Sequence, residues 1–175
     1  SVTGFGHRGP YRDRAAMDLV VQAMSGLMGK TGFPDGPPVK AGVMIGDEVT
    51  AVFAVVGVLA ALRQRDQDGR GRFVDVTMFE SLLNLVWDEP VDFYEEAGRP
   101  ERTGNVDLRA GPLGAFATRD GHVAMVLTSD EQWGRLCRRI GRPDLATLTR
   151  TDRRGEALAR ATTAVEQWCA ARTSD

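Results

Sequence analysis

The sequence predicts a mixed α/β protein built in two parts. Its 175 residues are enough for one sizeable domain or for pieces of two. Stretches with helical spacing of apolar residues are interspersed with short stretches in which apolar and polar residues alternate, as strands do. Residues 88–112 are polar, contain Gly and Pro and show little periodicity, so we predict a linker there. It separates a first part, residues 1–87, from a second part, residues 113–175.

The first part is predicted to open with the end of a strand. Ser1–Gly6 reads as a strand end entering a loop, and Gly and Pro residues continue that loop to Arg14. Residues 17–28 are predicted to form one helix, which Gly29 or Gly32 ends. Its apolar residues recur at i, i+3, i+4 and i+7 and share one face: Met17, Val20, Val21, Met24, Leu27 and Met28.

A long apolar helix dominates the rest of the first part. A loop rich in Gly and Pro at 31–38 leads into a short extended segment, 39–45. Residues 48–65 read as a helix that is apolar almost all round, so we expect it to be deeply buried. The remaining predicted elements are a turn at 66–71, a strand at 72–78 and a helix at 79–87.

The second part is predicted to be a hairpin followed by helices. Residues 114–127 fit two short strands around a turn that contains Gly121. Ser129 and Gln132 form a capping-box pair that opens a helix over 130–140. The last predicted helix spans 154–172, and its inward-facing residues are Leu158, Ala161, Val165, Trp168 and Cys169.

Composition and charge argue against several classes of partner. The net charge of −2 gives no reason to expect nucleic acid or an anionic membrane. The longest apolar run is shorter than the ~20 residues of a spanning helix, and no charged-then-apolar leader opens the chain. Cys137 and Cys169 are far apart and fit no metal or redox spacing. Buried, reduced thiols suit a cytosol, so we expect a cytoplasmic protein.

Arginines gather near the end of the chain, with acidic residues close by. We interpret these arginines as a solvated helical face. They are Arg135, Arg138, Arg139, Arg142, Arg150, Arg153 and Arg154.

The most informative candidate for chemistry is a carboxylate at the start of the long apolar helix. Asp47 follows Gly46 at the junction of an extended segment and that helix. One interpretation is an N-cap, worth about 1 kcal/mol. The other is a nucleophile, since a helix N-terminus favours an ionised carboxylate. A nucleophile also needs an open face, which a glycine neighbour can provide.

Other polar residues have weaker claims to a role. Asp18 is interpreted as a helix-start acid, although Gln22, one turn on, could join it in a polar face toward a ligand. His7 lies in a glycine loop that could border a pocket, and His122 lies in the hairpin. Neither histidine has neighbours at metal-ligand spacing, so no metal site is predicted. No Gly-x-Ser-x-Gly elbow is present, and Gly69–Gly71 reads as a turn rather than a dinucleotide loop.

Seven segments stand in a characteristic order along the chain. They are Thr3–Gly6 with Gly9–Tyr11, Met17–Met28, Thr31–Gly32 with Asp35–Pro38, Gly46–Asp47, Gly57–Leu62, Gly69–Val76, and Gly114–Thr118 with Asp120–Gly121. In order and spacing they resemble the class III CoA-transferase family, which includes formyl-CoA and carnitine CoA-transferases and their relative, alpha-methylacyl-CoA racemase. The likeness covers nearly the whole chain.

The resemblance implies that this chain is an internal fragment of a larger protein. Residues 1–87 would belong to the family's Rossmann-like large domain, and residues 113–175 would begin its smaller α+β domain. Segments that complete the site would precede Ser1 and follow Asp175. Family members form two interlocked chains, so the resemblance also implies a homodimer.

The resemblance further implies a reaction and the residues that carry it out. Asp47 matches the family's catalytic aspartate, which attacks the thioester of an acyl-CoA and forms an anhydride and then an aspartyl-CoA thioester. A small carboxylic acid then accepts the CoA. CoA is thus a substrate, and no permanently bound cofactor or metal is implied. The substrate- or CoA-binding residues implied are Arg14, Ala15, Ala16, Met17, Gly46 and Gly114. The loop Gly111–Gly114 corresponds loosely to a glycine-rich flap.

Met17 separates the two reaction types of the family. Racemase relatives carry a histidine directly before the position of Asp18, and Met17 takes its place here. A thioether cannot act as a base near neutral pH, which favours CoA transfer. A 2-methylacyl-CoA racemase or epimerase and a non-catalytic acyl-CoA-binding remnant remain as alternatives. We expect the 175-residue segment alone to be inactive.

Overall fold

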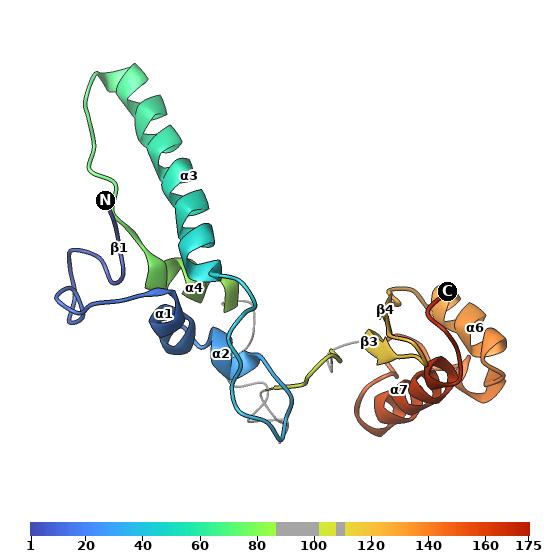
Figure 1. The fold of residues 1–175 in the computed structure, drawn as a ribbon. Coiled ribbons are helices and arrows are strands. Elements are labelled where there is room, and N and C mark those ends of the chain that lie inside the picture. Colours follow the sequence, from blue (N-terminus) through green and yellow to red (C-terminus); the bar gives the residue numbers. More distant parts are fainter. Residues whose placement is uncertain (87–101, 108–110) are drawn as a thin grey trace. The chain divides into compact units, whose positions relative to one another are not determined.

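The computed structural model describes residues 1–86, 102–107 and 111–175. It has a mixed α/β architecture with two compact units, Ser1–Arg102 and Thr103–Asp175 (Figure 1). Most of the predicted linker at 88–112 lies outside the described residues, as does Trp87 at the end of the predicted helix 79–87.

Over its described residues, 1–86 and 102, the first unit has a short parallel strand pair and four helices. Strand β1 (Val2–Thr3) pairs with β2 (Val76–Thr77), with Val2 opposite Val76. The helices are α1 (Asp18–Met24), α2 (Leu27–Lys30), α3 (Ile45–Asp68) and α4 (Met78–Val86). The prediction that Ser1–Gly6 holds a strand end is confirmed.

Two predictions about extended segments in this unit need correction. The short extended segment predicted at 39–45 ends at Met44, because Ile45 already belongs to α3, and residues 39–44 lie outside any strand. The predicted strand 72–78 is reduced to Val76–Thr77, and Met78 begins α4. A strand exists only where a neighbour pairs with it, and β1 offers β2 two paired residues. The alternating pattern therefore marked an extended segment that is mostly unpaired within the described residues.

The single helix predicted at 17–28 is two helices. α1 ends at Met24, and Gly26 adopts a positive φ of 88° before α2 begins. L side chains rarely take that conformation, so the glycine allows a break that the apolar spacing alone does not reveal. The buried residues of α1 are Asp18, Val21 and Gln22, so the predicted apolar face is largely exposed.

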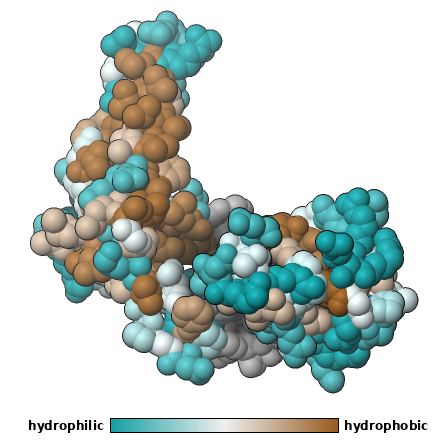
Figure 2. Space-filling view, turned by 45° about the vertical axis from the view of Figure 1, so that its right-hand side comes forward, coloured by the Kyte–Doolittle hydropathy of each residue, from teal (hydrophilic) through white to brown (hydrophobic). Residues whose placement is uncertain are grey.

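The expectation of a deeply buried α3 is wrong for this chain. Only Gly46 and Thr50 are buried, whereas Val52, Val55, Val56 and Leu59 are 59–64% exposed. These four residues form one apolar stripe, because they follow the i, i+3, i+4, i+7 spacing. Figure 2 shows hydrophobic side chains along α3 up to its hydrophilic far end.

α3 is also long and apolar enough, by length and composition alone, to cross a membrane. The apolar run itself, between Glu48 and Arg63, is shorter than the predicted limit, and the whole helix passes the test on its length and mean hydropathy. The core helix of a soluble protein passes the same test.

The second unit follows the prediction closely. Strands β3 (Leu113–Ala117) and β4 (His122–Val126) form an antiparallel hairpin, followed by helices α6 (Asp130–Arg139) and α7 (Gly155–Ala170) with the 3₁₀ turn η1 (Pro143–Leu145) between them. The predicted capping box is confirmed in both directions. The buried core consists of Phe116, Trp133, Cys137, Leu145, Ala161, Ala164, Val165 and Cys169.

One arginine departs from the predicted solvated face. Arg153 is 1% exposed. Its Nε donates to Gly111 O at 2.7 Å, and its Nη1 donates to Leu148 O at 2.7 Å and to Asp130 Oδ1 at 3.1 Å. The guanidinium also lies 5.2 Å from the centre of the Trp133 ring. These contacts replace water around Nε and Nη1, whereas Nη2 is buried without a hydrogen-bond partner among the described residues.

Candidate active site

The candidate nucleophile lies in the first turn of α3. Asp47 is the third residue of that helix, and the N-cap position belongs to Met44, which makes no side-chain cap bond. The N-cap interpretation of Asp47 is therefore wrong. Its side chain is exposed and forms no hydrogen bond or ion pair with any described residue. Within the described part of the chain, the carboxylate of Asp47 therefore stabilises no other element through a polar contact.

A carboxylate from another helix takes over the capping of α3. Asp18, the first residue of α1, is 4% exposed, and its Oδ1 accepts a hydrogen bond from Gly46 N–H at 2.7 Å. The amides of a first helical turn have no intrahelical acceptor, so Asp18 satisfies one of them. The predicted helix-start acid does begin α1, but its carboxylate serves α3.

The two helices approach so closely here that Gly46 has no room for a side chain. A Cβ at this position would lie 2.8 Å from Asp18 Oδ1, 3.1 Å from Val21 Cγ2 and 3.3 Å from Leu82 Cδ1. The absence of a Cβ therefore permits the contact between α1 and α3. In the sequence, Gly46 was interpreted as opening a face for a ligand, and in the structure its Cβ direction faces the protein.

Gln22 extends the polar contact to the segment that leads into α3. Its Nε2 donates to Asp18 Oδ2 at 2.5 Å, and its Oε1 accepts from Ala41 N–H at 2.8 Å. Gln22 is fully buried. The expectation that Asp18 and Gln22 point toward a ligand therefore fails, because both side chains bond inside the unit.

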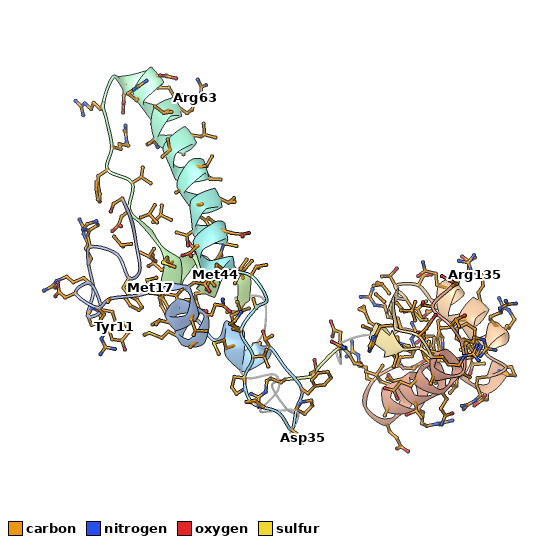
Figure 3. The ribbon with its side chains drawn as sticks, in the orientation of Figure 1. Tyr11, Met17, Asp35, Met44, Arg63 and Arg135 are labelled. Carbon is orange, nitrogen blue, oxygen red and sulfur yellow. The ribbon has the colours of Figure 1, made fainter. Side chains whose placement is uncertain are left out.

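The predicted CoA-contacting segment leads directly to this junction. Arg14 and Ala15 are exposed, Ala16 is half-buried against Gly4, and Met17 is the 74% exposed N-cap residue of α1. Figure 3 labels Met17 at the start of α1 and Met44 directly before α3. Because Asp18 bonds to Gly46, the segment ending at Met17 and the helix start carrying Asp47 meet at one place.

Arg14 is held against an aromatic ring in that segment. Its guanidinium lies 4.2 Å from the centre of the Tyr11 ring. The backbone N–H of Arg14 also donates to the backbone carbonyl oxygen of Tyr11 at 2.9 Å. Both side chains are exposed. A cation on an aromatic face is positioned while its charge stays available to solvent or a ligand.

Gly114 belongs to the second unit. It lies in β3, where it bridges to Val106, and a Cβ on it would overlap Asn105 O. Ala115 N–H donates to the same oxygen at 2.9 Å. The structure therefore gives Gly114 a packing reason, while part of the stretch before Gly111 lies outside the described residues.

Of the two histidines, His7 has structural contacts. His7 Nε2 lies 2.7 Å from Ser1 Oγ, and its backbone N–H donates to Asp75 Oδ2 at 3.1 Å. His122 is exposed in β4. Among the described residues, no group of three or more His, Cys, Asp or Glu side chains is placed to hold a metal ion.

The sequence matches CoA-transferase family III over residues 1–175. The chain belongs to that family. The resemblance stated from the motifs is therefore confirmed, and so is the prediction of a partial class III CoA-transferase fold.

Individual family members agree with this assignment. The chain is 37% identical to succinyl-CoA–D-citramalate CoA-transferase of Chloroflexus aurantiacus over 99% of this chain and 44% of that enzyme. It is 37% identical to succinyl-CoA:mesaconate CoA-transferase of Haloarcula hispanica over 83% of this chain and 38% of that enzyme. A CAIB/BAIF family protein from Brucella suis matches with a TM-score of 0.77 and 30% identity, over 99% of this chain and 47% of that one. The chain thus spans less than half the length of these relatives.

Proposed function

We propose that the full-length protein is a CoA-transferase that moves CoA between an acyl-CoA thioester and a carboxylic acid, with Asp47 as nucleophile. The observation that carries the proposal is an exposed carboxylate, without a partner among the described residues, in the first turn of α3. Family membership and the two relatives named as CoA-transferases support it.

The reaction would proceed through two covalent forms of Asp47. A carboxylate oxygen attacks the thioester carbonyl, the C–S bond breaks, and a mixed anhydride forms while CoA leaves as a thiolate. The thiolate attacks the aspartyl carbonyl, which releases the first acid and gives an aspartyl-CoA thioester. The incoming acid attacks that thioester, the C–S bond breaks, and a second mixed anhydride forms as the thiolate leaves. The thiolate then attacks the new acyl carbonyl, which gives the product acyl-CoA and regenerates the Asp47 carboxylate. Covalent exchange divides one difficult transfer into easier steps.

The first turn of α3 suits this role. The positive end of a helix dipole favours a carboxylate in its ionised, nucleophilic form. Glu48 beside it is also exposed, so the turn carries two acids, and the one adjacent to Gly46 is the proposed nucleophile. The hydrogen bond between Asp18 and Gly46 holds the start of α1 beside this turn. The segment directly before Asp18 therefore lies near the turn, and we assign its residues Arg14, Ala15, Ala16 and Met17 to CoA binding.

The segment Gly111–Gly114, predicted as a loop but entering β3 at Leu113, is the remaining proposed contact with the substrate. We assign Gly111–Gly114 to the cover over the acyl-aspartyl intermediate, on the strength of the motif order alone. No permanently bound cofactor is part of the proposal, because CoA enters as a thioester substrate.

The structure weakens the racemase alternative. A racemase needs a base on each side of the substrate's α-carbon. Met17 lacks a basic atom, and Asp18 is buried with both oxygens engaged by Gly46 and Gln22. Neither can remove a proton from a substrate near Asp47 in this arrangement.

The partners and location belong to the same proposal. We propose acyl-CoA and a small carboxylic acid as substrates, and an interlocked homodimer as the active assembly. Two free, buried cysteines fit a reducing compartment, which supports a cytoplasmic location.

The test is trapping of the covalent intermediate in the full-length protein. After incubation with an acyl-CoA, hydroxylamine or borohydride should modify the peptide that contains Asp47. Asp47→Asn should abolish both adduct and turnover, whereas Glu48→Gln removes a charge from the same turn and should leave both in place. Retained turnover in Asp47→Asn would reject the assignment. Deuterium exchange at the α-carbon without an adduct would favour the racemase, and CoA binding with neither would favour the non-catalytic alternative.

A further inference from the structure

A buried chain of hydrogen bonds connects two points of the backbone around the start of α3. It runs from Ala41 N–H to Gln22 Oε1 at 2.8 Å, from Gln22 Nε2 to Asp18 Oδ2 at 2.5 Å, and from Gly46 N–H to Asp18 Oδ1 at 2.7 Å. Gln22 is fully buried and Asp18 is 4% exposed. The proposed chemistry uses neither side chain. Asp18 forms no ion pair with a described residue, and a buried carboxylate without a cationic partner is unfavourable.

We propose that Asp18 is a positioning residue that fixes the carboxylate of Asp47 by holding the preceding amide. This inference rests on the proposed role of Asp47 as nucleophile. α3 lacks a side-chain cap of its own, because Met44 supplies none. Thr50 Oγ1 donates to Gly46 O from within α3, so among the described residues the bond from Gly46 N–H to Asp18 is the side-chain anchor that reaches this turn from another helix. Asp18 itself does not reach the substrate, since both of its oxygens are engaged within the protein.

The direction of the hydrogen bonds explains why this pair is an acid and an amide. A backbone N–H can only donate. The side chains that meet Ala41 N–H and Gly46 N–H, at the two ends of this run of hydrogen bonds, must therefore present acceptors. A carboxylate accepts at both oxygens, while the amide of Gln22 accepts at one end and donates at the other. The three hydrogen bonds, at Ala41, between the two side chains and at Gly46, then each have one donor and one acceptor.

Asp18→Asn must break one of these three hydrogen bonds. If the new amide oxygen accepts from Gly46, its nitrogen faces the nitrogen of Gln22. If Gln22 turns over, its own nitrogen faces Ala41 N–H. Two donors face each other in either case, and an unsatisfied buried donor disturbs the turn that holds Asp47.

Exchanging the carboxylate at position 18 and the amide at position 22 should restore all three hydrogen bonds. In Asp18→Asn combined with Gln22→Glu, the asparagine oxygen accepts from Gly46 and its nitrogen donates to the introduced carboxylate. The other oxygen of that carboxylate accepts from Ala41. Every one of the three hydrogen bonds then has a donor and an acceptor, and the net charge equals that of the wild type. Only the hydrogen bond between the two side chains reverses its direction.

The experiment measures kcat, KM for acyl-CoA and the single-turnover rate of adduct formation at Asp47 in the full-length protein. We expect Asp18→Asn to lower kcat and the adduct rate by about 100-fold, the scale of a small misplacement of a reacting group. KM should hold, because Asp18 makes no contact with substrate. The double variant should recover most of the loss. Asp66→Asn makes the same change at the exposed far end of α3 and should match the wild type.

Each other result overturns the proposal in a distinct way. Wild-type kcat in Asp18→Asn would show that the anchor is dispensable. A folded but inactive double variant would show that the carboxylate must stand at position 18 itself, as a catalytic acid would. If Asp18→Asn does not fold, the double variant decides alone, and it must both fold and turn over. Absence of an adduct at Asp47 in the wild type would refute the proposed function directly, without any variant of Asp18.

Discussion

The carboxylate of Asp18 and the backbone of Gly46 are in direct contact, with 2.7 Å between Oδ1 and the amide nitrogen. The two residues are 28 positions apart in the sequence, yet they join the first turns of α1 and α3. The contact replaces the missing side-chain cap of α3 and leaves the side chain of the next residue, Asp47, exposed.

Gly46→Ala should destabilise the protein. Its Cβ would meet Asp18 Oδ1 at 2.8 Å, and overpacking of this kind costs about 1–3 kcal/mol, against the roughly 1 kcal/mol that alanine gains over glycine in a helix. Denaturant unfolding should show a net loss, together with lower turnover. Gly42→Ala is the matched control, because nothing lies within 4 Å of its Cβ position. Equal stability of the two variants would contradict the close approach of the helices.

Arg153 should be the arginine of its cluster on which stability depends. Arg153→Met would leave Gly111 O and Leu148 O without their donor, and each buried acceptor left unsatisfied costs roughly 1–3 kcal/mol, whereas the partner Asp130 is exposed and keeps its water. Unfolding followed by the fluorescence of Trp133, whose ring faces the guanidinium, should report the loss. Arg150→Met, at an exposed position, should change the free energy of unfolding by less than about 0.5 kcal/mol. A similar result for both variants would argue against a structural role of the buried charge.

Gly114 should tolerate no side chain. A Cβ would overlap the backbone oxygen of Asn105, and backbone atoms cannot move aside as a flexible side chain does. Gly114→Ala should lower the free energy of unfolding by about 2 kcal/mol and increase hydrogen exchange at Ala115, which bonds to the same oxygen. Gly121→Ala, in the turn of the same hairpin with open space around it, serves as the control. Wild-type exchange at Ala115 in the Gly114 variant would refute this explanation.

Cys137 should make stability fall at alkaline pH. Burial raises the pKa of its thiol from 9.0 to about 11, so the folded chain keeps a proton that the unfolded chain loses. This contribution is complete below pH 9 and is lost as the pH rises from 9 to about 11, with a slope approaching about 1.4 kcal/mol per pH unit. The free energy of unfolding should therefore fall more steeply in the wild type than in Cys137→Ala over that interval. Parallel curves would exclude the thiol as the cause.

The apolar stripe of α3 should make the isolated 175-residue chain self-associate. Val52, Val55, Val56 and Leu59 are 59–64% exposed, and an apolar face of this size promotes association. Sedimentation velocity should show species larger than a monomer that decrease on dilution, and Val55→Glu with Leu59→Glu should shift the chain toward monomer. Gln67→Glu adds the same kind of charge near the exposed end of the helix and should leave association unchanged. A well-behaved, active monomer would contradict this prediction.

Local patterns were sufficient wherever an element depends on its own residues. The hairpin, the capping box at Ser129 and Gln132, and the last helix were all predicted, because turn residues, caps and helical spacing act over a few positions. The prominence of Asp47 was also evident from its place beside Gly46. The break at Gly26 was missed, because regular apolar spacing continues across it while the backbone does not.

The sequence by itself determined the family, the order of the elements and the residue proposed as nucleophile. Only the tertiary structure decided that Asp18 caps another helix, that Gly46 faces Asp18 rather than a ligand, and that Arg153 is buried. These relationships join residues 23 to 42 positions apart, and no periodicity or short motif encodes such a pairing. They arise when elements pack, because a buried polar group must find its partner wherever the fold places one.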